Sequence, residues 1–144
     1  MLVRDVLDAK GRRVVAIEAD ALVNEAIAKL VQNNIGSLPV VDEDGLLVGV
    51  FSERDVLRLF HHRGDGFGGL RVSEVMTRDP AICDARDDVE EVMGLMSRRS
   101  IAKVPVTEDA QLVGVISVGD VIKIMCERLS DENQHLMTYI QGGA

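Results

Sequence analysis

LVGVFSERDV at residues 47–56 returns as LVGVISVGDV at residues 112–121, and this repetition decides the fold. The stretch before each copy repeats as well, since IGSLPVVD at 35–42 aligns with IAKVPVTE at 101–108. Self-similarity at a fixed spacing is typical of a chain built from copies of one structural unit. The sequence therefore predicts two equivalent units.

The same alignment sets the bounds of the units and of the segments between them. The first repeat covers residues 3–60 and the second covers 72–129, with a linker over 61–71 and a tail over 130–144. Four glycines in the linker sequence HHRGDGFGG indicate a flexible connection between the repeats.

Hydrophobic patterning predicts the order β-α-β-β-α in both repeats, because short apolar runs indicate strands and a spacing of three and four indicates helices. In the first repeat we expect strands at 14–17, 38–41 and 46–51, and helices from Asp20 and after Ser52. In the second we expect strands at 81–82, 104–107 and 112–116, a helix that carries Val89, Val92, Met93 and Met96, and a last helix that begins at Ser117. The helices of a repeat cover one face of its sheet, so the other face must pack against something else. We therefore expect an α/β (α+β) fold whose two repeats pack sheet to sheet with pseudo-twofold symmetry.

Composition excludes several classes of function. The net charge is −8 and aromatic residues make up only 3%, whereas nucleic-acid binding needs a basic surface and often stacking rings. No apolar run approaches the length of a membrane span, and the N-terminus lacks the apolar core of a signal peptide. The two cysteines, Cys83 and Cys126, suit a reducing compartment. We expect a soluble, cytoplasmic protein that binds neither nucleic acid nor membrane.

The pattern Gly-hydrophobic-hydrophobic-Ser-x-x-Asp occurs at 49–55 and again at 114–120. One interpretation is structural: Ser-x-x-Asp at the start of a helix is a capping box that satisfies free backbone N–H groups. The other is functional, because a carboxylate fixed at a helix N-terminus can accept both hydroxyls of a ribose. Repetition of the whole pattern favours the functional interpretation.

Catalysis and metal binding have no support in the sequence. Ser52 and Ser117 are repeated, but no repeated histidine accompanies them to act as a base, so we expect no enzyme. The adjacent His61 and His62 lack the spacing of metal ligands. We therefore expect no metal and no obligatory cofactor.

The two repeated motifs together resemble a pair of CBS domains, which are named after cystathionine β-synthase, and the chain is similar to small stand-alone bacterial CBS-pair proteins. The resemblance implies a non-catalytic regulatory module that binds AMP, ADP, ATP, NAD or S-adenosylmethionine. Ligand would set the orientation of the two repeats and thereby signal to a protein partner that the sequence does not identify.

The resemblance also implies two clefts, each shared between the repeats. One cleft would use Ser52 and Asp55 together with Asp79, Pro80, Ala81, Ile101, Lys103 and Pro105. Arg54, just before Asp55, is either a further phosphate ligand from the facing repeat or a solvated residue at the start of its helix. The other would use Ser117 and Asp120 together with Val14, Val15, Ile35, Ser37 and Pro39. Lys103 stands where the family often has a phosphate ligand, and Ser37 is its counterpart. We therefore expect weaker phosphate binding in the Asp120 cleft.

Two rival functions stay open. The chain could be a purely structural or dimerisation module whose clefts are closed by side chains. It could also be a small hydrolase or transferase acting on nucleotides, which would require a general base that the sequence does not show.

The pattern of apolar residues in the C-terminal region predicts a homodimer that forms through helices. The last helix of the second repeat has more apolar residues than one face requires, and Leu136, Met137 and Ile140 continue at helical spacing in the tail. A two-fold interface would cover identical apolar patches on both subunits. The alternative is that the tail folds back over its own repeat.

Overall fold

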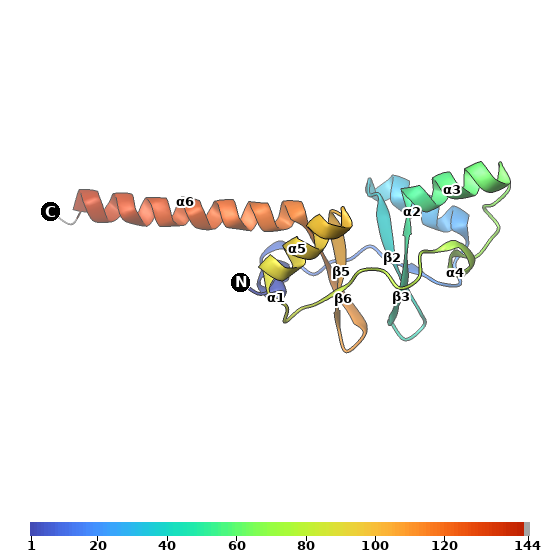
Figure 1. Ribbon diagram of the computed structural model, residues 1–144, viewed down its shortest axis with the longest axis horizontal. Helices are drawn as coiled ribbons and strands as arrows, with labels where there is room; N and C mark the ends of the chain where they lie inside the picture. The colour runs from blue at the N-terminus through green and yellow to red at the C-terminus, as the bar shows by residue number, and fades with distance from the viewer. Residues whose placement is uncertain (143–144) are drawn as a thin grey trace.

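The computed structural model describes residues 1–142 as two side-by-side halves from which one long helix projects (Figure 1). The first half of the chain forms α1 (Val3–Lys10), β1 (Ile17–Glu18), α2 (Val23–Asn33), β2 (Ser37–Val41), β3 (Leu47–Ser52) and α3 (Glu53–Arg63). The second forms α4 (Val72–Val75), β4 (Cys83–Asp84), α5 (Val89–Arg99), β5 (Lys103–Glu108), β6 (Gln111–Ser117) and α6 (Val118–Gly142). The α/β fold with two β-α-β-β-α repeats is confirmed, and each repeat has an additional leading helix.

Each repeat forms its own three-stranded sheet, in the orders β1-β2-β3 and β4-β5-β6. The first strand runs parallel to the second, and the second pairs antiparallel with the third. Ile17 lies opposite Val40 and Cys83 lies opposite Val106, so the two sheets share one register. The repeats are therefore equivalent in structure as well as in sequence.

The first strand of each repeat begins later than the sequence predicts. Residues 14–16 and 81–82 lie outside β1 and β4, although each was expected to form a strand. The position before each strand would lie opposite Pro39 or Pro105, and proline has no N–H to donate to a ladder. Pairing therefore starts one residue beyond each proline.

The helix predicted from Asp20 begins at Val23 instead. The residues before Val23 form hydrogen bonds with the second repeat instead. The carbonyl of Ala19 accepts the N–H of Ser73 and the carbonyl of Ala21 accepts the N–H of Val72, both at 2.9 Å. These carbonyls are engaged by another segment, so the helix starts after them.

The two leading helices are exchanged between the halves. In α1, Val3, Val6 and Leu7 are fully buried in the core of the second half, whereas Val72 of α4 is fully buried in the core of the first. The exchange is reciprocal, because Leu2 bridges to Asp88 in the same way that Arg71 bridges to Leu22. Neither half completes its core from its own repeat alone.

Pseudo-twofold symmetry also appears where the two hairpin turns meet. Leu47 donates its N–H to the carbonyl of Ala110 at 3.2 Å, and the equivalent Leu112 donates to the carbonyl of Gly45 at 3.4 Å. The two turns lie next to each other on the same side of the molecule in Figure 1. Reciprocal bonds of this kind are what a twofold relation between the repeats produces.

The motif glycines allow the exchanged segments to lie close to the sheets. A Cβ on Gly49 would stand 2.6 Å from the sulfur of Met76 and 2.8 Å from the carbonyl oxygen of Thr77. A Cβ on Gly114 would stand 2.8 Å from a methyl carbon of Leu7, the counterpart of Met76. Only glycine leaves enough room for these contacts.

We expect Gly49→Ala to lower the free energy of unfolding by about 2 kcal/mol, because the new methyl group meets backbone as well as side chain. Gly114→Ala should cost less, since the Leu7 side chain can turn away. Urea denaturation measures both, with Gly69→Ala as the control, because a Cβ there meets nothing within 4 Å. Equal stability of Gly49→Ala and Gly69→Ala would contradict the steric role.

Helix α6 continues without a break through the predicted tail and projects from the body (Figure 1). The predicted alternative, a tail folded over its own repeat, is not what the structure shows. Beyond Val121, its apolar side chains are largely exposed: Ile122, Met125, Leu129, Leu136, Met137, Tyr139 and Ile140. Residues 143–144 of the predicted tail lie outside the described residues. Within the described part of the chain, no helix is long and apolar enough to cross a membrane.

Candidate functional site

Both Ser-x-x-Asp motifs form capping boxes at the ends of β3 and β6. Ser52 accepts the backbone N–H of Asp55 at 3.4 Å, and Asp55 accepts that of Ser52 at 2.9 Å. In the second repeat the corresponding bonds between Ser117 and Asp120 are both 3.0 Å. The structural interpretation is confirmed for both motifs. It leaves the functional one open, because a carboxylate has acceptor capacity beyond one capping bond.

Asp55 is enclosed by its surroundings. Only 5% of the residue is exposed, and its second carboxylate oxygen accepts the hydroxyl of Thr77 at 3.2 Å. Thr77 is held there by two backbone hydrogen bonds with Val50, of 2.9 and 3.0 Å. The sequence analysis missed Thr77. Thr77 directly follows Met76 in the sequence, and Met76 packs on Gly49 of the motif, so this neighbour relation is the feature that could have indicated Thr77.

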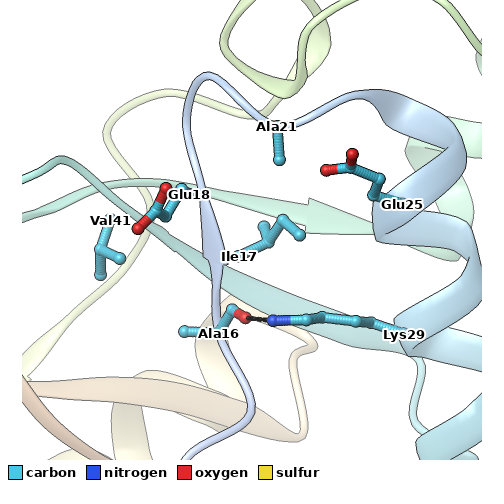
Figure 2. Close-up of a pocket in the computed structure, with 7 residues that line it drawn as sticks. All are labelled: Ala16, Ile17, Glu18, Ala21, Glu25, Lys29 and Val41. Atoms are coloured by element: carbon cyan, nitrogen blue, oxygen red, sulfur yellow. Dashed lines mark hydrogen bonds between the residues drawn. The ribbon is translucent and has the colours of Figure 1, made fainter.

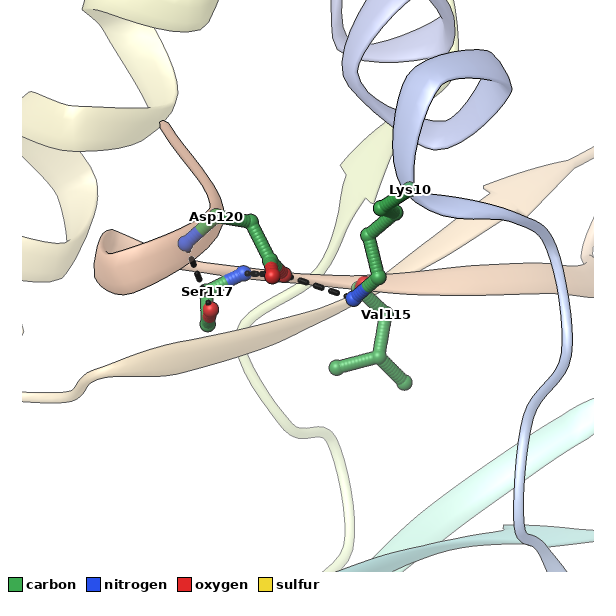
Figure 3. A network of polar contacts seen from close by, with 4 residues as sticks. All are labelled: Lys10, Val115, Ser117 and Asp120. Atoms are coloured by element: carbon green, nitrogen blue, oxygen red, sulfur yellow. Dashed lines mark hydrogen bonds and ion pairs between the residues drawn. The ribbon is translucent and has the colours of Figure 1, made fainter. Parts of the chain in front are cut away.

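Asp120 is paired with a lysine from the other repeat (Figure 3). The Nζ atom of Lys10 lies 2.6 Å from Oδ2 of Asp120 and 2.8 Å from the carbonyl oxygen of Val115. Burial disfavours the ionised carboxylate, but the hydrogen bonds from Lys10 and Ser117 outweigh it and lower the pKa of Asp120. The aspartate therefore stays charged and holds the lysine.

Lys10 was also missed by the sequence analysis. It is the last residue of α1, which has eight residues where its counterpart α4 has four. The additional turn carries the lysine to β6. The sequence signal is the longer stretch between the leading apolar residues and the first strand in the first repeat.

Strand pairing shows which of the predicted cleft residues lie next to each motif. Lys103 lies opposite Ser117 and Ser37 lies opposite Ser52, so each belongs beside the motif of its own repeat. An antiparallel hairpin brings the start of one strand to the end of its partner, so Lys103 lies next to Ser117, and its predicted grouping with Asp55 stays a prediction. Pro39 and Pro105 likewise lie opposite Val50 and Val115 of the neighbouring strand.

The segments before β1 and β4 were predicted to line the two clefts, and the structure places only the second of them near the strand that leads to a motif. A groove of about 250 Å³ is lined by Leu47 and Val48 of β3 and by Asp79, Pro80, Ile82, Thr107 and Ala110. Asp79 and Pro80 thus face the strand that ends at Ser52, but at its opposite end, and Ala81 lies between lining residues. Val14 and Val15 follow Lys10 along the chain, and Val15 packs on the core of the first half. No contact described within residues 1–142 joins either valine to Asp120.

The two motif ends differ in charge. Glu53 follows Ser52 and donates its N–H to the carbonyl of Gly36 at 3.0 Å, whereas Val118 makes the same bond to Ala102. The Asp55 end thus has an additional carboxylate, which lies over Gly36, while its neighbour Arg54 is exposed in the first turn of α3. The Asp120 end has Lys10 on the aspartate and Lys103 beside Ser117. The Asp120 end therefore has two lysines near its motif, whereas the Asp55 end has the carboxylate of Glu53 together with the guanidinium of Arg58, which lies 3.9 Å from Asp55.

A second hollow of about 580 Å³ lies within the first half, between β1 and α2 (Figure 2). Its only cation is Lys29, whose Nζ atom donates to the carbonyl of Ala16 at 2.7 Å. It includes none of the residues predicted to bind ligand: its lining is Ala16, Ile17, Glu18, Ala21, Glu25, Lys29 and Val41. It is separate from both capping boxes.

Comparison with known proteins agrees with this architecture. The CBS domain matches residues 3–62 and 72–127. The CBS domain-containing protein CBSX3, mitochondrial, of Arabidopsis thaliana is 30% identical over 149 residues, which cover 98% of this chain and 72% of the relative.

Two solved structures share the fold. The CBS-domain containing protein ATU1752 from Agrobacterium tumefaciens is 35% identical with a TM-score of 0.77, over 87% of this chain and 99% of its own. The CBS domain pair of protein MJ0100, in complex with 5′-methylthioadenosine and S-adenosyl-L-methionine, is 27% identical with a TM-score of 0.74. The alignment covers 89% of this chain and 98% of that one. With two matched repeats covering most of its length, this chain belongs to the CBS-domain family as a tandem pair.

Proposed function

We propose that the chain is a non-catalytic regulatory module that binds an adenine nucleotide at the Ser-x-x-Asp motifs. The observation that carries this proposal is the Asp120 end of the second repeat, where a charged aspartate at a helix start is flanked by Lys10 and Lys103. An acceptor for ribose hydroxyls thus lies beside two donors for phosphate. The adenosine derivatives bound by the MJ0100 pair support the same class of ligand.

Ligand would act through the relative placement of the two repeats. A nucleotide would favour one arrangement only by its differential affinity for it. AMP, ADP, ATP, NAD and S-adenosylmethionine all carry the adenosine that Asp120 would hold. The output would pass to a protein partner, in a reducing compartment such as the cytoplasm that suits the free Cys83 and Cys126.

Thermal unfolding of the full chain with each of these ligands tests the function. A ligand present at a hundred times its Kd should raise the free energy of unfolding by about 2.7 kcal/mol, since it binds only the folded state. Unchanged unfolding with every adenosine derivative would overturn the proposal. Conversion of any ligand to product during incubation would show an enzyme instead.

A structural role has specific support at the other motif. Asp55 is almost fully buried and already accepts hydrogen bonds from Ser52 and Thr77. These bonds join β3 to the exchanged segment, so Asp55 ties the two repeats together without ligand. We therefore propose nucleotide binding first for the Asp120 cleft.

Asp55→Ala should accordingly lower the free energy of unfolding by about 2–3 kcal/mol, because it leaves buried donors without an acceptor. Urea denaturation measures the loss, and Asp88→Ala, which removes the exposed cap of α5, is the control. The control should cost about 1 kcal/mol. A smaller loss for Asp55→Ala than for Asp88→Ala would contradict the structural role.

We also propose a homodimer in which α6 pairs with α6 of a second copy. Ile122, Leu129 and Leu136 are seven residues apart, and Cys126 and Asn133 fall between them at alternating steps of four and three. This is the spacing of a two-stranded coiled coil, in which a single core asparagine favours parallel pairing in one register. The exposure of these apolar side chains in the single chain supports a second copy as their cover.

A further inference from the structure

Lys10 occupies the place where the proposed ribose would bind, and this inference rests on the proposed function. Its Nζ atom and the N–H of Ser117 both donate to Oδ2 of Asp120, at 2.6 and 3.0 Å. Two donors use the lone pairs of that oxygen and leave only Oδ1 free. A ribose that uses both carboxylate oxygens must therefore displace the lysine.

We propose that Lys10 determines the specificity of the Asp120 cleft for phosphate: it holds Asp120 while the cleft is empty and turns to the phosphate of a nucleotide whose ribose takes its place. Lys10 is not part of the repeated motif. It reaches the cleft because α1 packs in the core of the second half and is one turn longer than α4.

The geometry allows the lysine to change partner. The side chains of Lys10 and Asp120 are 31% and 25% exposed, so solvent weakens their ion pair. The lysine side chain is long and flexible, and α1 is anchored by Val3, Val6 and Leu7 rather than by Lys10. Movement of the ammonium group therefore leaves the packing of the helix intact.

Displacement has different consequences for different ligands. A nucleoside that displaces Lys10 leaves the ammonium group without an anionic partner. A nucleotide supplies its phosphate as a replacement, and Lys103 beside Ser117 adds a second positive charge. The cleft should consequently prefer AMP to adenosine, although both carry the same ribose and base.

The Asp55 end is arranged differently. Its carboxylate accepts the hydroxyl of Thr77 and lies 3.9 Å from the guanidinium of Arg58 on its own helix, and Glu53 adds a negative charge next to the motif. The exchanged segment thus brings a hydroxyl to Asp55 where it brings an ammonium group to Asp120.

Calorimetry with AMP and with adenosine tests this proposal on the full-length chain. The proteins are the wild type, Lys10→Ala, Lys10→Arg and the control Arg12→Ala, which removes a nearby exposed positive charge paired with Asp8. The measured quantity is the ratio of the two affinities. Each is measured in an Asp55→Asn background that restricts binding to the Asp120 cleft, with circular dichroism to confirm folding.

We expect Lys10→Ala to lower the preference for AMP over adenosine by about tenfold, the effect of one partly exposed charge-assisted bond. Adenosine should bind at least as tightly as in the wild type, because its competitor is gone. Lys10→Arg and Arg12→Ala should keep the preference.

Three outcomes would count against the inference. If Lys10→Ala tightened both ligands equally, the lysine would only block the cleft, and if neither affinity changed, it would play no part in binding. Either result overturns the role of Lys10 and leaves the proposed function standing. If neither the wild-type chain nor the Asp55→Asn variant bound AMP or adenosine, the proposed function would fail, and the role of Lys10 would fail with it.

Discussion

Asp120→Ala is expected to weaken AMP binding in its cleft by about a hundredfold, since the ribose would lose two charge-assisted hydrogen bonds of roughly 1.5 kcal/mol or more each. The loss should be nearly as large for adenosine, because the ribose contact is common to both ligands. Calorimetry on the full chain measures it, and Asp120→Asn should recover only part of the affinity.

The control must separate ribose binding from helix capping, because Asp120 also accepts the N–H of Ser117. Asp88→Ala removes a comparable cap from α5, far from the motif in sequence, through the bond between Asp88 and the N–H of Glu90. Both variants should lose about 1 kcal/mol of stability, but only Asp120→Ala should lose affinity. Normal binding by an Asp120→Ala protein that melts early would leave capping as the whole role of the residue.

Deletion of residues 131–144 is expected to convert the protein from dimer to monomer. The deletion removes Asn133, Leu136 and Ile140, which with Ile122, Cys126 and Leu129 make up the series at alternating steps of four and three, so half of the proposed seam is lost. Too little helix remains for a stable pair. Light scattering at micromolar concentration should give about twice 15.7 kDa for the full chain and a monomer for the deletion.

A point variant refines this test without shortening the chain. Leu136→Glu places a charge in the proposed seam and should also give a monomer, whereas Thr138→Glu lies on the opposite side of the helix and should stay dimeric. A deletion variant that remains a dimer would place the interface in the helices of the repeats. A monomeric wild type would end the proposal.

The sequence predicted the parts of this fold that local patterns determine. The hairpin strands and the caps at Ser52 and Ser117 follow from apolar runs and from a motif whose chemistry is contained in four residues. It did not predict the exchange of α1 and α4, because an amphipathic helix has the same pattern whichever core receives it. The longer stretch before the first strand indicates that Lys10 differs from its counterpart, but the partner of Lys10 depends on which core receives α1.

The position of Lys103 next to Ser117 follows from register, which the resemblance did not supply. Register in turn depends on the hairpin between β5 and β6, which the sequence predicted correctly.

Because α1 and α4 are exchanged, neither repeat should fold stably when it is expressed alone. A fragment ending in the linker would keep the sheet that contains Phe51 but lack Val72, which fills part of its interior. It would also carry α1, whose Val3, Val6 and Leu7 would have no interior to enter. Each fragment would have an incomplete core and an apolar helix with no core to pack into. The two halves should therefore unfold together.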